Sequence, residues 1–149
     1  MNATLLSSTK MDWCTPMEFF KELDAEFHFT LDAAATPKSA KCSKYFTVED
    51  NALEQDWGGH AVFINPPYGR TLGKWVEKAY REGQKANTTV VLLIPARTDT
   101  TYFHKYILGK AEIRFLRGRL KFTDENGMAK DAAPFPSLVA IYRGRDGGV

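Results

Sequence analysis

The sequence predicts an α/β fold, with an open, mostly parallel sheet and helices on both faces. Two short apolar runs, "AVFI" at residues 61–64 and "TTVVLLIP" at residues 88–95, are typical of strands buried in such a sheet. Between them, over residues 71–86, apolar side chains recur at three- and four-residue spacing, which indicates an amphipathic helix. Because strands alternate with helices, we expect parallel strands that bind ligands beyond their carboxyl ends.

Local signals predict the other elements. Thr15 as N-cap, Pro16 as the first helical residue and Glu18 in a capping box predict a helix from Pro16 to about Phe27. The remaining expectations are a short buried strand that ends near Asp32, an irregular segment over 36–59 with at most one short strand or helix, a helix over about 99–108, and strands over 111–116, about 119–122 and 137–143.

Length and composition favour one domain. The chain has 149 residues, of which 44% are hydrophobic, enough for a single core over residues 1–149. No stretch approaches the roughly 18 apolar residues of a membrane span, and no signal peptide is apparent, so we expect a cytoplasmic protein with no membrane contact. Cys14 and Cys42 lie in no metal-ligand spacing, which predicts two reduced thiols and no metal site.

Charge is divided unevenly along the chain. Residues 1–69 carry 5 Lys/Arg against 10 Asp/Glu, a net charge of −5, whereas residues 70–149 carry 15 against 8, a net charge of +7. Such asymmetry indicates a polyanionic partner for the basic half. Solvated helix faces are the alternative explanation, and charge alone favours that alternative.

The stretch "FINPPYGR", residues 63–70, puts polar and aromatic groups just past the predicted strand 61–64. This order suits methylation of an exocyclic amino group, whose lone pair is delocalised into the ring. The side-chain oxygen of Asn65 and the carbonyl of Pro66 can each accept an amino hydrogen and so localise that lone pair. Pro67 helps to keep the turn rigid, and Tyr68 offers a ring on which a base can stack. The alternative is a proline-rich turn with a buried asparagine.

These residues carry a family resemblance. "NPPY" resembles the catalytic motif of amino-group methyltransferases that use S-adenosylmethionine, and the chain resembles the phage-encoded (bacteriophage) DNA N-6-adenine methyltransferases of the Dam-like family. The motifs that carry the likeness are "DWCTP", "LDAAAT", "KYFTVEDNAL", "FINPPYG", "PARTDTTYFH", "RGRLKF" and "APFPSLVAIYR". The resemblance implies an abbreviated Rossmann-like S-adenosylmethionine-dependent methyltransferase fold, in which "AAATPK" replaces the usual glycine-rich turn after the first strand.

The resemblance also implies which residues bind the cofactor. They are Trp13, Thr15, Pro16, Asp32, Glu49 and Asp50. The first three match a motif that closes over the methionine end, where a helix start offers backbone donors to the carboxylate. Asp32 matches an acidic residue that attracts the sulfonium and amino groups, and Glu49 or Asp50 accepts hydrogen bonds from the adenosine part. A packed helix cap, an aspartate in a turn and an exposed acidic pair are the respective alternatives.

Residues 70–149 would then bind the nucleic acid, and residues 1–69 mainly the cofactor. The implied DNA-binding residues are Arg97, Arg114, Arg117, Arg119 and Phe135. The arginines suit phosphates, Arg97 also suits a base, and Phe135 is expected to present its ring to an adenine flipped out of the duplex. A core phenylalanine is the alternative for Phe135.

The function that we expect is methyl transfer from S-adenosylmethionine to the exocyclic amino group of adenine in DNA, with base flipping. The protein would act in the host cytoplasm, as a monomer or homodimer. Methylation of RNA or of a glutamine side chain is one alternative, and a catalytically silent nucleic-acid-binding protein is another. Little chain beyond residues 123–136 is left to read bases, which predicts a short or degenerate target sequence.

Overall fold

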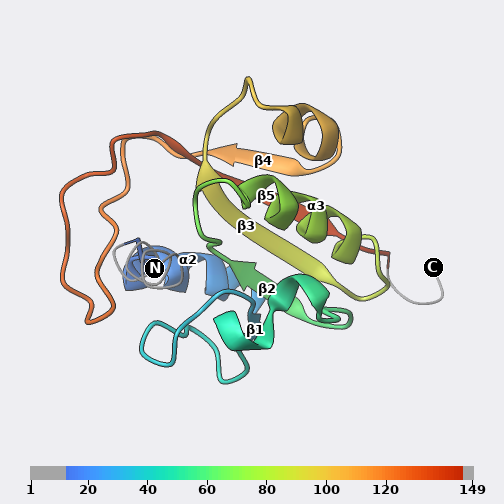
Figure 1. The fold of residues 1–149 in the computed structure, drawn as a ribbon, viewed down its shortest axis with the longest axis horizontal. Helices are drawn as coiled ribbons and strands as arrows, with labels where there is room; N and C mark the ends of the chain where they lie inside the picture. The colour runs from blue at the N-terminus through green and yellow to red at the C-terminus, as the bar shows by residue number, and fades with distance from the viewer. Residues whose placement is uncertain (1–12, 146–149) are drawn as a thin grey trace.

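The computed structural model describes residues 13–145, and five strands in this range form one sheet (Figure 1). The strands are β1 (Leu31–Asp32), β2 (Ala61–Ile64), β3 (Thr89–Pro95), β4 (Glu112–Phe115) and β5 (Ser137–Arg143), in the spatial order β1-β2-β3-β5-β4. The first three are parallel, and β5 is antiparallel to both β3 and β4. β4 therefore runs in the same direction as β1, β2 and β3, and the sheet is parallel over its first three strands, as predicted, but antiparallel at both pairings of β5.

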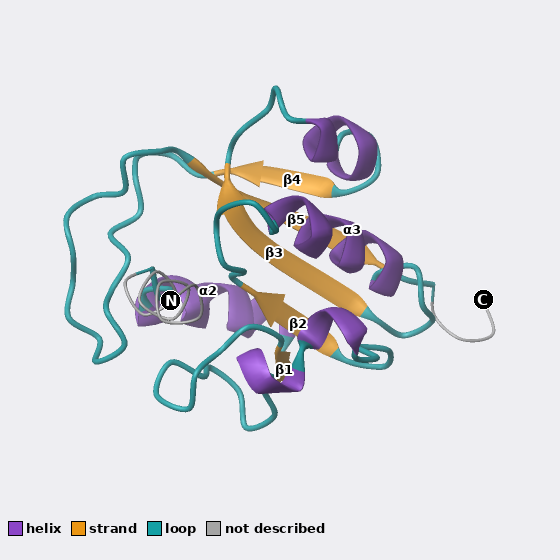
Figure 2. Cartoon of the chain, viewed as in Figure 1, coloured by secondary structure: helices purple, strands orange, loops and turns teal. Residues whose placement is uncertain are grey.

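Helices cover both faces of this sheet. They are α2 (Met17–Phe27), α3 (Leu72–Glu82) and a π-helical turn, η3 (Phe103–Ile107), where a longer helix over 99–108 was expected. Figure 2 shows α3 lying along β3 and β5 on the near face. Within the described range, no helix has the length and apolar character needed to cross a membrane.

Successive side chains of β3 point to opposite faces of the sheet and so divide the core into two layers. Val90, Leu92 and Ile94 pack on the face that carries α3 and η3. Val91 and Leu93 pack on the opposite face, which carries α2. Since both helices bury apolar side chains against the same strand, the sheet is covered on both sides and its carboxyl edge is left for a site.

The start of α2 differs from the sequence prediction. The helix begins at Met17 with Pro16 as its N-cap, and no side chain caps it, so neither the Thr15 cap nor the capping box with Glu18 forms. Thr15 is buried, and its hydroxyl oxygen accepts a hydrogen bond from the side chain of Asn65 instead. The residue before a proline also favours extended backbone, which keeps Thr15 outside the helix.

The segment between β1 and β2 is irregular, with one more short helical turn than predicted. Two 3-10 turns, η1 (Val48–Asp50) and η2 (Ala52–Glu54), follow each other around Asn51, which has a φ of 51°. Asparagine tolerates this left-handed backbone better than most residues.

Residues 116–136 form a long excursion between β4 and β5, which we call the arm (Figure 1). The strand predicted near 119–122 is wrong, because the arm pairs with itself through separate backbone bonds, such as Lys130 N to Phe122 O and Ala133 N to Leu120 O. Pro134 and Pro136 remove two backbone donors from the returning chain, which limits a regular ladder.

Candidate active site

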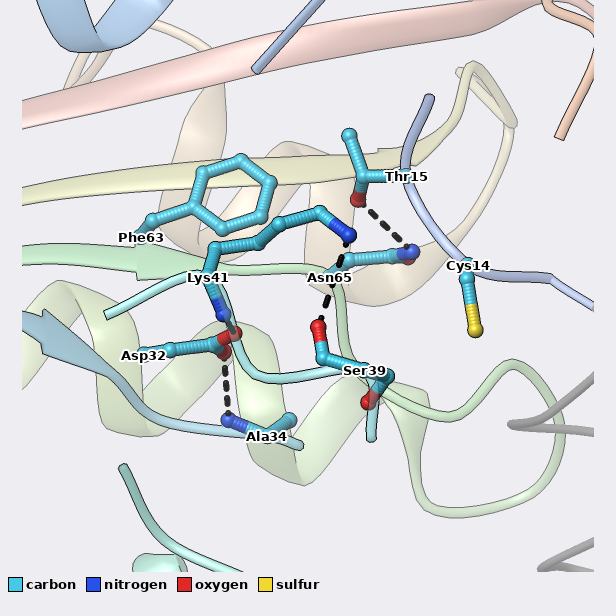
Figure 3. Close-up of a pocket in the computed structure, with 8 residues that line it drawn as sticks. All are labelled: Cys14, Thr15, Asp32, Ala34, Ser39, Lys41, Phe63 and Asn65. Atoms are coloured by element: carbon cyan, nitrogen blue, oxygen red, sulfur yellow. Dashed lines mark hydrogen bonds between the residues drawn. The ribbon is translucent and has the colours of Figure 1, made fainter. Parts of the chain in front are cut away.

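Asn65 follows β2 directly and is 2% exposed. Its Nδ2 donates one hydrogen bond to the backbone oxygen of Trp13 at 2.7 Å and another to Oγ1 of Thr15 at 3.1 Å. Figure 3 shows the bond to Thr15. Because both amide hydrogens are used, the orientation of the side chain is fixed and its Oδ1 is the end that can accept from a ligand.

The two prolines carry the chain from Asn65 to α3. Pro66 is buried, whereas Pro67 is partly exposed and lines a hollow described below. Gly69 has a φ of +143°, a conformation that favours glycine, and its carbonyl accepts from Leu72 N at 3.2 Å. The turn is thus stiff at the prolines and sharply redirected at Gly69.

Tyr68 lies among other rings rather than on an open surface. Its ring meets Phe122 and Phe135 edge to face, with centroids 6.3 and 5.6 Å apart. The hydroxyl donates a long hydrogen bond of 3.4 Å to Leu93 O, and burial raises the pKa of Tyr68 above its ordinary value. The phenol is therefore neutral, and the ring of Tyr68 packs against two rings of the arm.

Trp13 completes this aromatic cluster, which comprises Trp13, Tyr68, Phe122 and Phe135. The Trp13 ring lies 5.4 Å from the ring of Phe122 and 5.4 Å from that of Phe135. Arg97 Cζ lies 6.0 Å from the centre of the Phe135 ring. Four residues singled out in the sequence are thus brought together: Trp13, Tyr68, Arg97 and Phe135. Phe122, which is fully buried, was missed because it was assigned to a strand.

A small polar hollow adjoins Asn65 (Figure 3). Its lining residues are Cys14, Thr15, Asp32, Ala34, Ser39, Lys41, Phe63 and Asn65. Asp32 is 3% exposed, and its carboxylate accepts from Ala34 N at 3.3 Å and from Lys41 N at 3.0 Å. The carboxylate therefore shapes the loop after β1 as well as contributing negative charge to the hollow.

A larger apolar hollow of about 220 Å³ is also lined by the loop that follows β1. Its lining residues are Ala33, Ala34, Ala35, Thr36, Phe46, Thr47, Val48, Asn51, Ala52, Leu53, Pro67, Thr71 and Trp75. Ala34 lines both hollows, and both lie past the carboxyl ends of β1 and β2, where the α/β fold predicts a ligand. The small side chains of "AAAT" were the sequence signal for this opening.

Glu49 and Asp50 do not line the apolar hollow, although their neighbours Val48 and Asn51 do. Both acidic residues are exposed, and Oδ2 of Asp50 accepts from the backbone N and the hydroxyl of Thr47 at 2.8 and 3.1 Å. Asp50 thus caps η1. A cofactor contact by either residue stays a prediction.

The basic residues predicted to bind DNA divide into two groups. Arg114 forms a bidentate ion pair with Glu26, at 2.7 and 2.8 Å, and its Nε donates to Glu112 at 2.7 Å. Arg117 and Arg119 are exposed on the arm, and Nη1 of Arg119 donates to Ala133 O at 3.3 Å. Arg114 is therefore engaged by carboxylates, whereas the arm presents the other two to solvent.

The described residues offer no metal centre. No group of three or more His, Cys, Asp or Glu side chains in the range 13–145 is arranged to hold a metal ion. Burial and then the charges of Asp32 and Asp24 raise the pKa of Cys42 to about 12, so this thiol stays protonated at neutral pH.

The fold and the site define an α/β protein with two hollows at the carboxyl ends of parallel strands, bordered by an Asn-Pro-Pro-Tyr loop. The chain belongs to the DNA N-6-adenine-methyltransferase (Dam) family, whose sequence profile matches residues 2–147. The family resemblance drawn from the motifs is therefore confirmed.

Two phage proteins are similar over most of this chain. The DNA N-6-adenine-methyltransferase of Escherichia phage T1 is 32% identical over 149 residues, an alignment that covers 88% of this chain and 62% of the T1 protein. The protein of the same name from Haemophilus phage HP1 (strain HP1c1) is 30% identical over 139 residues, covering 91% of this chain and 80% of the relative.

A bacterial protein is similar over a shorter stretch. The putative methyltransferase YfdM of Escherichia coli (strain K12) is 41% identical over 63 residues, which cover 38% of this chain and 69% of that protein.

Proposed function

We propose that this protein transfers a methyl group from S-adenosylmethionine to the exocyclic amino group of adenine in DNA, in the host cytoplasm. Family membership and the names of the phage relatives support the reaction class. The observation that carries the proposal is the oriented amide of Asn65, which is buried, lines the polar hollow and donates to the backbone oxygen of Trp13, a member of the aromatic cluster. In keeping with it, we interpret the five-strand sheet as an abbreviated Rossmann-like methyltransferase fold.

The donor set fits S-adenosylmethionine. The apolar hollow has aromatic and aliphatic walls from Phe46, Val48 and Trp75 for an adenine, with polar groups such as Asn51 at its margin for ribose hydroxyls. The polar hollow carries the Asp32 carboxylate, which suits the positively charged amino group at the other end of the cofactor. Because Ala34 lines both, the two hollows adjoin the same loop after β1.

S-adenosylmethionine, when bound, supplies a methyl group on a positively charged sulfur. Oδ1 of Asn65 and the carbonyl of Pro66 accept the two amino hydrogens of the target adenine, which localises the nitrogen lone pair toward the methyl carbon. The C–S electron pair would leave with the sulfur as a neutral thioether while the new N–C bond forms, and the methylated amino group would lose its extra proton to water. The bonds from Asn65 to Trp13 and Thr15 hold its acceptor in place before the substrate arrives, which lowers reorganisation.

An adenine in a duplex has to leave the stack to reach Asn65, at a cost of a few kcal/mol. Stacking on Tyr68 and Phe135 offsets part of this cost, at about 1–3 kcal/mol per base. Since Phe135 belongs to the arm and now packs on Tyr68, we propose that the arm shifts when the base enters. Arg117 and Arg119 on the arm, and Arg97 beside Phe135, would hold the neighbouring phosphates.

Transfer of a labelled methyl group to duplex DNA, RNA and protein tests this function. We expect incorporation into DNA by the native protein and at least about a hundredfold less by Asn65→Ala. Incorporation into RNA or into a glutamine side chain instead would favour the alternative substrates. Binding of DNA without any binding of S-adenosylmethionine would indicate a catalytically silent protein.

A further inference from the structure

We propose that the hydroxyl of Ser137 donates a hydrogen bond to a ring nitrogen of the target adenine, next to the amino group that is methylated. This inference rests on the proposed function and adds a substrate-binding residue to it. Ser137 is the first residue of β5 and is 1% exposed. Its Oγ is closed off from solvent and has no hydrogen-bond partner among the residues that the structure describes.

A buried hydroxyl without a partner is unusual, because burial removes the water that would otherwise bond it. The other serine and threonine side chains buried in the described range, those of Thr15, Ser39 and Thr88, each bond another group of the protein. Alanine would fit at position 137 with no unpaired group, so the hydroxyl of Ser137 costs stability in the free protein. A polar group with such a cost is expected where function uses it.

Ser137 faces the same side of the sheet as the aromatic cluster. Along β5, Val139 and Ile141 pack on the face that carries α2, and side chains two residues apart share a face, so Ser137 belongs to this face as well. Tyr68 and Phe135 pack against the same core layer. The hydroxyl is therefore on the side of the sheet where the adenine is proposed to stack.

Strand register places Ser137 at the carboxyl end of the parallel strands. Ser137 pairs with Pro95, the last residue of β3, whereas Val139 pairs with Leu93. The hydroxyl of Tyr68 bonds Leu93 O, and Pro95 lies two residues further on, about 7 Å along the strand. Ser137 thus lies one step beyond the Tyr68 hydroxyl, at the edge of the sheet that carries the Asn-Pro-Pro-Tyr loop.

The chemistry of adenine suits a hydroxyl donor at this place. When Asn65 and Pro66 accept the two amino hydrogens, the ring nitrogens on either side of the amino group, N1 and N7, can each still accept a hydrogen bond. A serine hydroxyl rotates to donate to such an acceptor. Strands β2 and β5 lie on either side of β3, about 10 Å apart, so Asn65 and Ser137 can hold one base between them.

The sheet keeps Ser137 in place independently of the arm. Ser137 O accepts a hydrogen bond from Leu116 N at 3.0 Å, and Ala96 N donates to Pro136 O at 2.8 Å. These bonds tie both ends of the arm to the sheet. Ser137 therefore stays fixed when the arm shifts with Phe135, as the proposed function requires, and a donor on a fixed strand needs little reorganisation.

The test combines Ser137→Ala with substrates that lack one ring nitrogen. Synthetic duplexes carry adenine, 1-deazaadenine or 7-deazaadenine at a target position identified by modification mapping, and single-turnover methyl transfer is measured on each. We expect Ser137→Ala to lower the rate on adenine about five- to tenfold. On the deaza duplex that lacks the bonded nitrogen, the native protein and Ser137→Ala should differ by less than about twofold. Ser137→Cys keeps the volume but is a weak donor, so it should resemble Ser137→Ala.

Thermal unfolding gives a second readout. Ser137→Ala should leave Tm unchanged or raise it, because it removes no hydrogen bond of the free protein. Thr88→Ala is the matched control. Thr88 is also 1% exposed, but its hydroxyl bonds Gly59 N and Ala86 O at the opposite end of β3. Thr88→Ala is expected to lower Tm and to leave the ratios of the rates on the three duplexes unchanged.

Other outcomes overturn the assignment. An equal loss of rate on all three duplexes would show that the hydroxyl bonds no ring nitrogen, and a lowered Tm in addition would make Ser137 a structural residue. Rates on adenine within about twofold of the native rate, in both Ser137→Ala and Ser137→Cys, would remove Ser137 from the site. If the native protein methylates no duplex at all, the proposed function itself fails, which is distinct from a native protein whose rate does not depend on Ser137.

Discussion

At the scale of single residues, the site depends on side chains whose polar atoms are engaged before any ligand binds. Asn65 uses its two amide hydrogens on Trp13 and Thr15, and Tyr68 directs its hydroxyl toward Leu93 O. Groups fixed in this way need little rearrangement when charge develops in the reaction. The same fixation makes substitutions at these two residues informative.

Asn65→Ala is expected to leave the fold intact and to lower turnover by at least about a hundredfold, because a preoriented acceptor for the target amino group is lost. Single-turnover methyl transfer measures the effect, with thermal unfolding as the control for the fold. Near-normal single-turnover rates in Asn65→Ala would show that the amide does not activate the amino group.

Tyr68→Phe is expected to retain most activity, whereas Tyr68→Ala loses it, because the ring provides the stacking surface and the hydroxyl makes a single long bond. Burial raises the pKa of Tyr68, so the phenol is still neutral at the pH where an exposed tyrosine ionises, near 10. The pH–rate profiles of the native protein and Tyr68→Phe should therefore coincide up to about pH 10. A drop in activity near neutral pH that Tyr68→Phe abolishes would contradict this.

At the scale of elements, the loop after β1 and the arm meet over the site. Thr36, which lines the apolar hollow, donates its hydroxyl hydrogen to Glu125 of the arm, and Cys14 pairs with Thr123 through the backbone. The segment expected to bind cofactor and the segment expected to bind DNA thus share contacts. Their roles are nevertheless separable by substitution.

Asp32→Ala is expected to weaken binding of S-adenosylmethionine with little effect on DNA affinity. It removes the acceptor for Ala34 N and Lys41 N, so these two amides should also exchange their hydrogens faster. Asp24→Ala is the matched control, since Asp24 also accepts a backbone hydrogen bond, from Phe29, but lines neither hollow. Loss of DNA affinity alone in Asp32→Ala would contradict the division of roles.

Combined Arg117→Ala and Arg119→Ala should weaken DNA binding and flatten its salt dependence, by about 0.9 in the logarithmic slope for each lost phosphate contact. Arg114→Ala is the control, because Arg114 is engaged by Glu26 and Glu112 and is expected to change the slope less. Titrations of duplex DNA at several salt concentrations measure both. A slope that falls with Arg114→Ala and not with the arm variant would reverse this assignment.

The sequence predicted the structure correctly where one physical signal dominated. It did not do so where contacts between distant segments determine the structure. The buried strands β2 and β3 and the helix α3 were predictable because periodicity and continuous apolar runs reflect their burial. The arm was not, because two prolines on the returning chain override the strand propensity of "RLKF". Phe122 was missed as a site residue because tertiary contacts alone bring its ring to Trp13, Tyr68 and Phe135.

At the scale of the whole molecule, the acidic and basic parts of the sequence interleave. β3 and β5, from the basic part, pack in the same core layers as β1, β2 and α2 from the acidic part. The arm is the main segment of the basic part left outside the sheet and its helices. A single domain, divided into a cofactor side and a nucleic-acid side, remains our interpretation of this arrangement.

The size of the arm predicts limited sequence specificity. Each base pair read directly needs a side chain placed in a groove, worth about 1–3 kcal/mol of discrimination. The part of the arm beyond Thr123 already uses Glu125 to contact Thr36, so few side chains are left for bases. We expect one protomer to recognise a short or degenerate sequence around adenine, unless a homodimer brings a second arm to the same DNA. A fixed target of about six or more base pairs, methylated by a proven monomer, would contradict this.

Long-read modification mapping of a plasmid treated to completion with the protein and S-adenosylmethionine tests the central claim most directly. It identifies both the modified base and its sequence context. We predict methyl groups on the exocyclic amino group of adenine, at short or degenerate sites, and none on plasmid treated with Asn65→Ala for the same time. Methyl groups on cytosine, or a plasmid without modified adenine under conditions where the protein binds S-adenosylmethionine and DNA, would contradict the account.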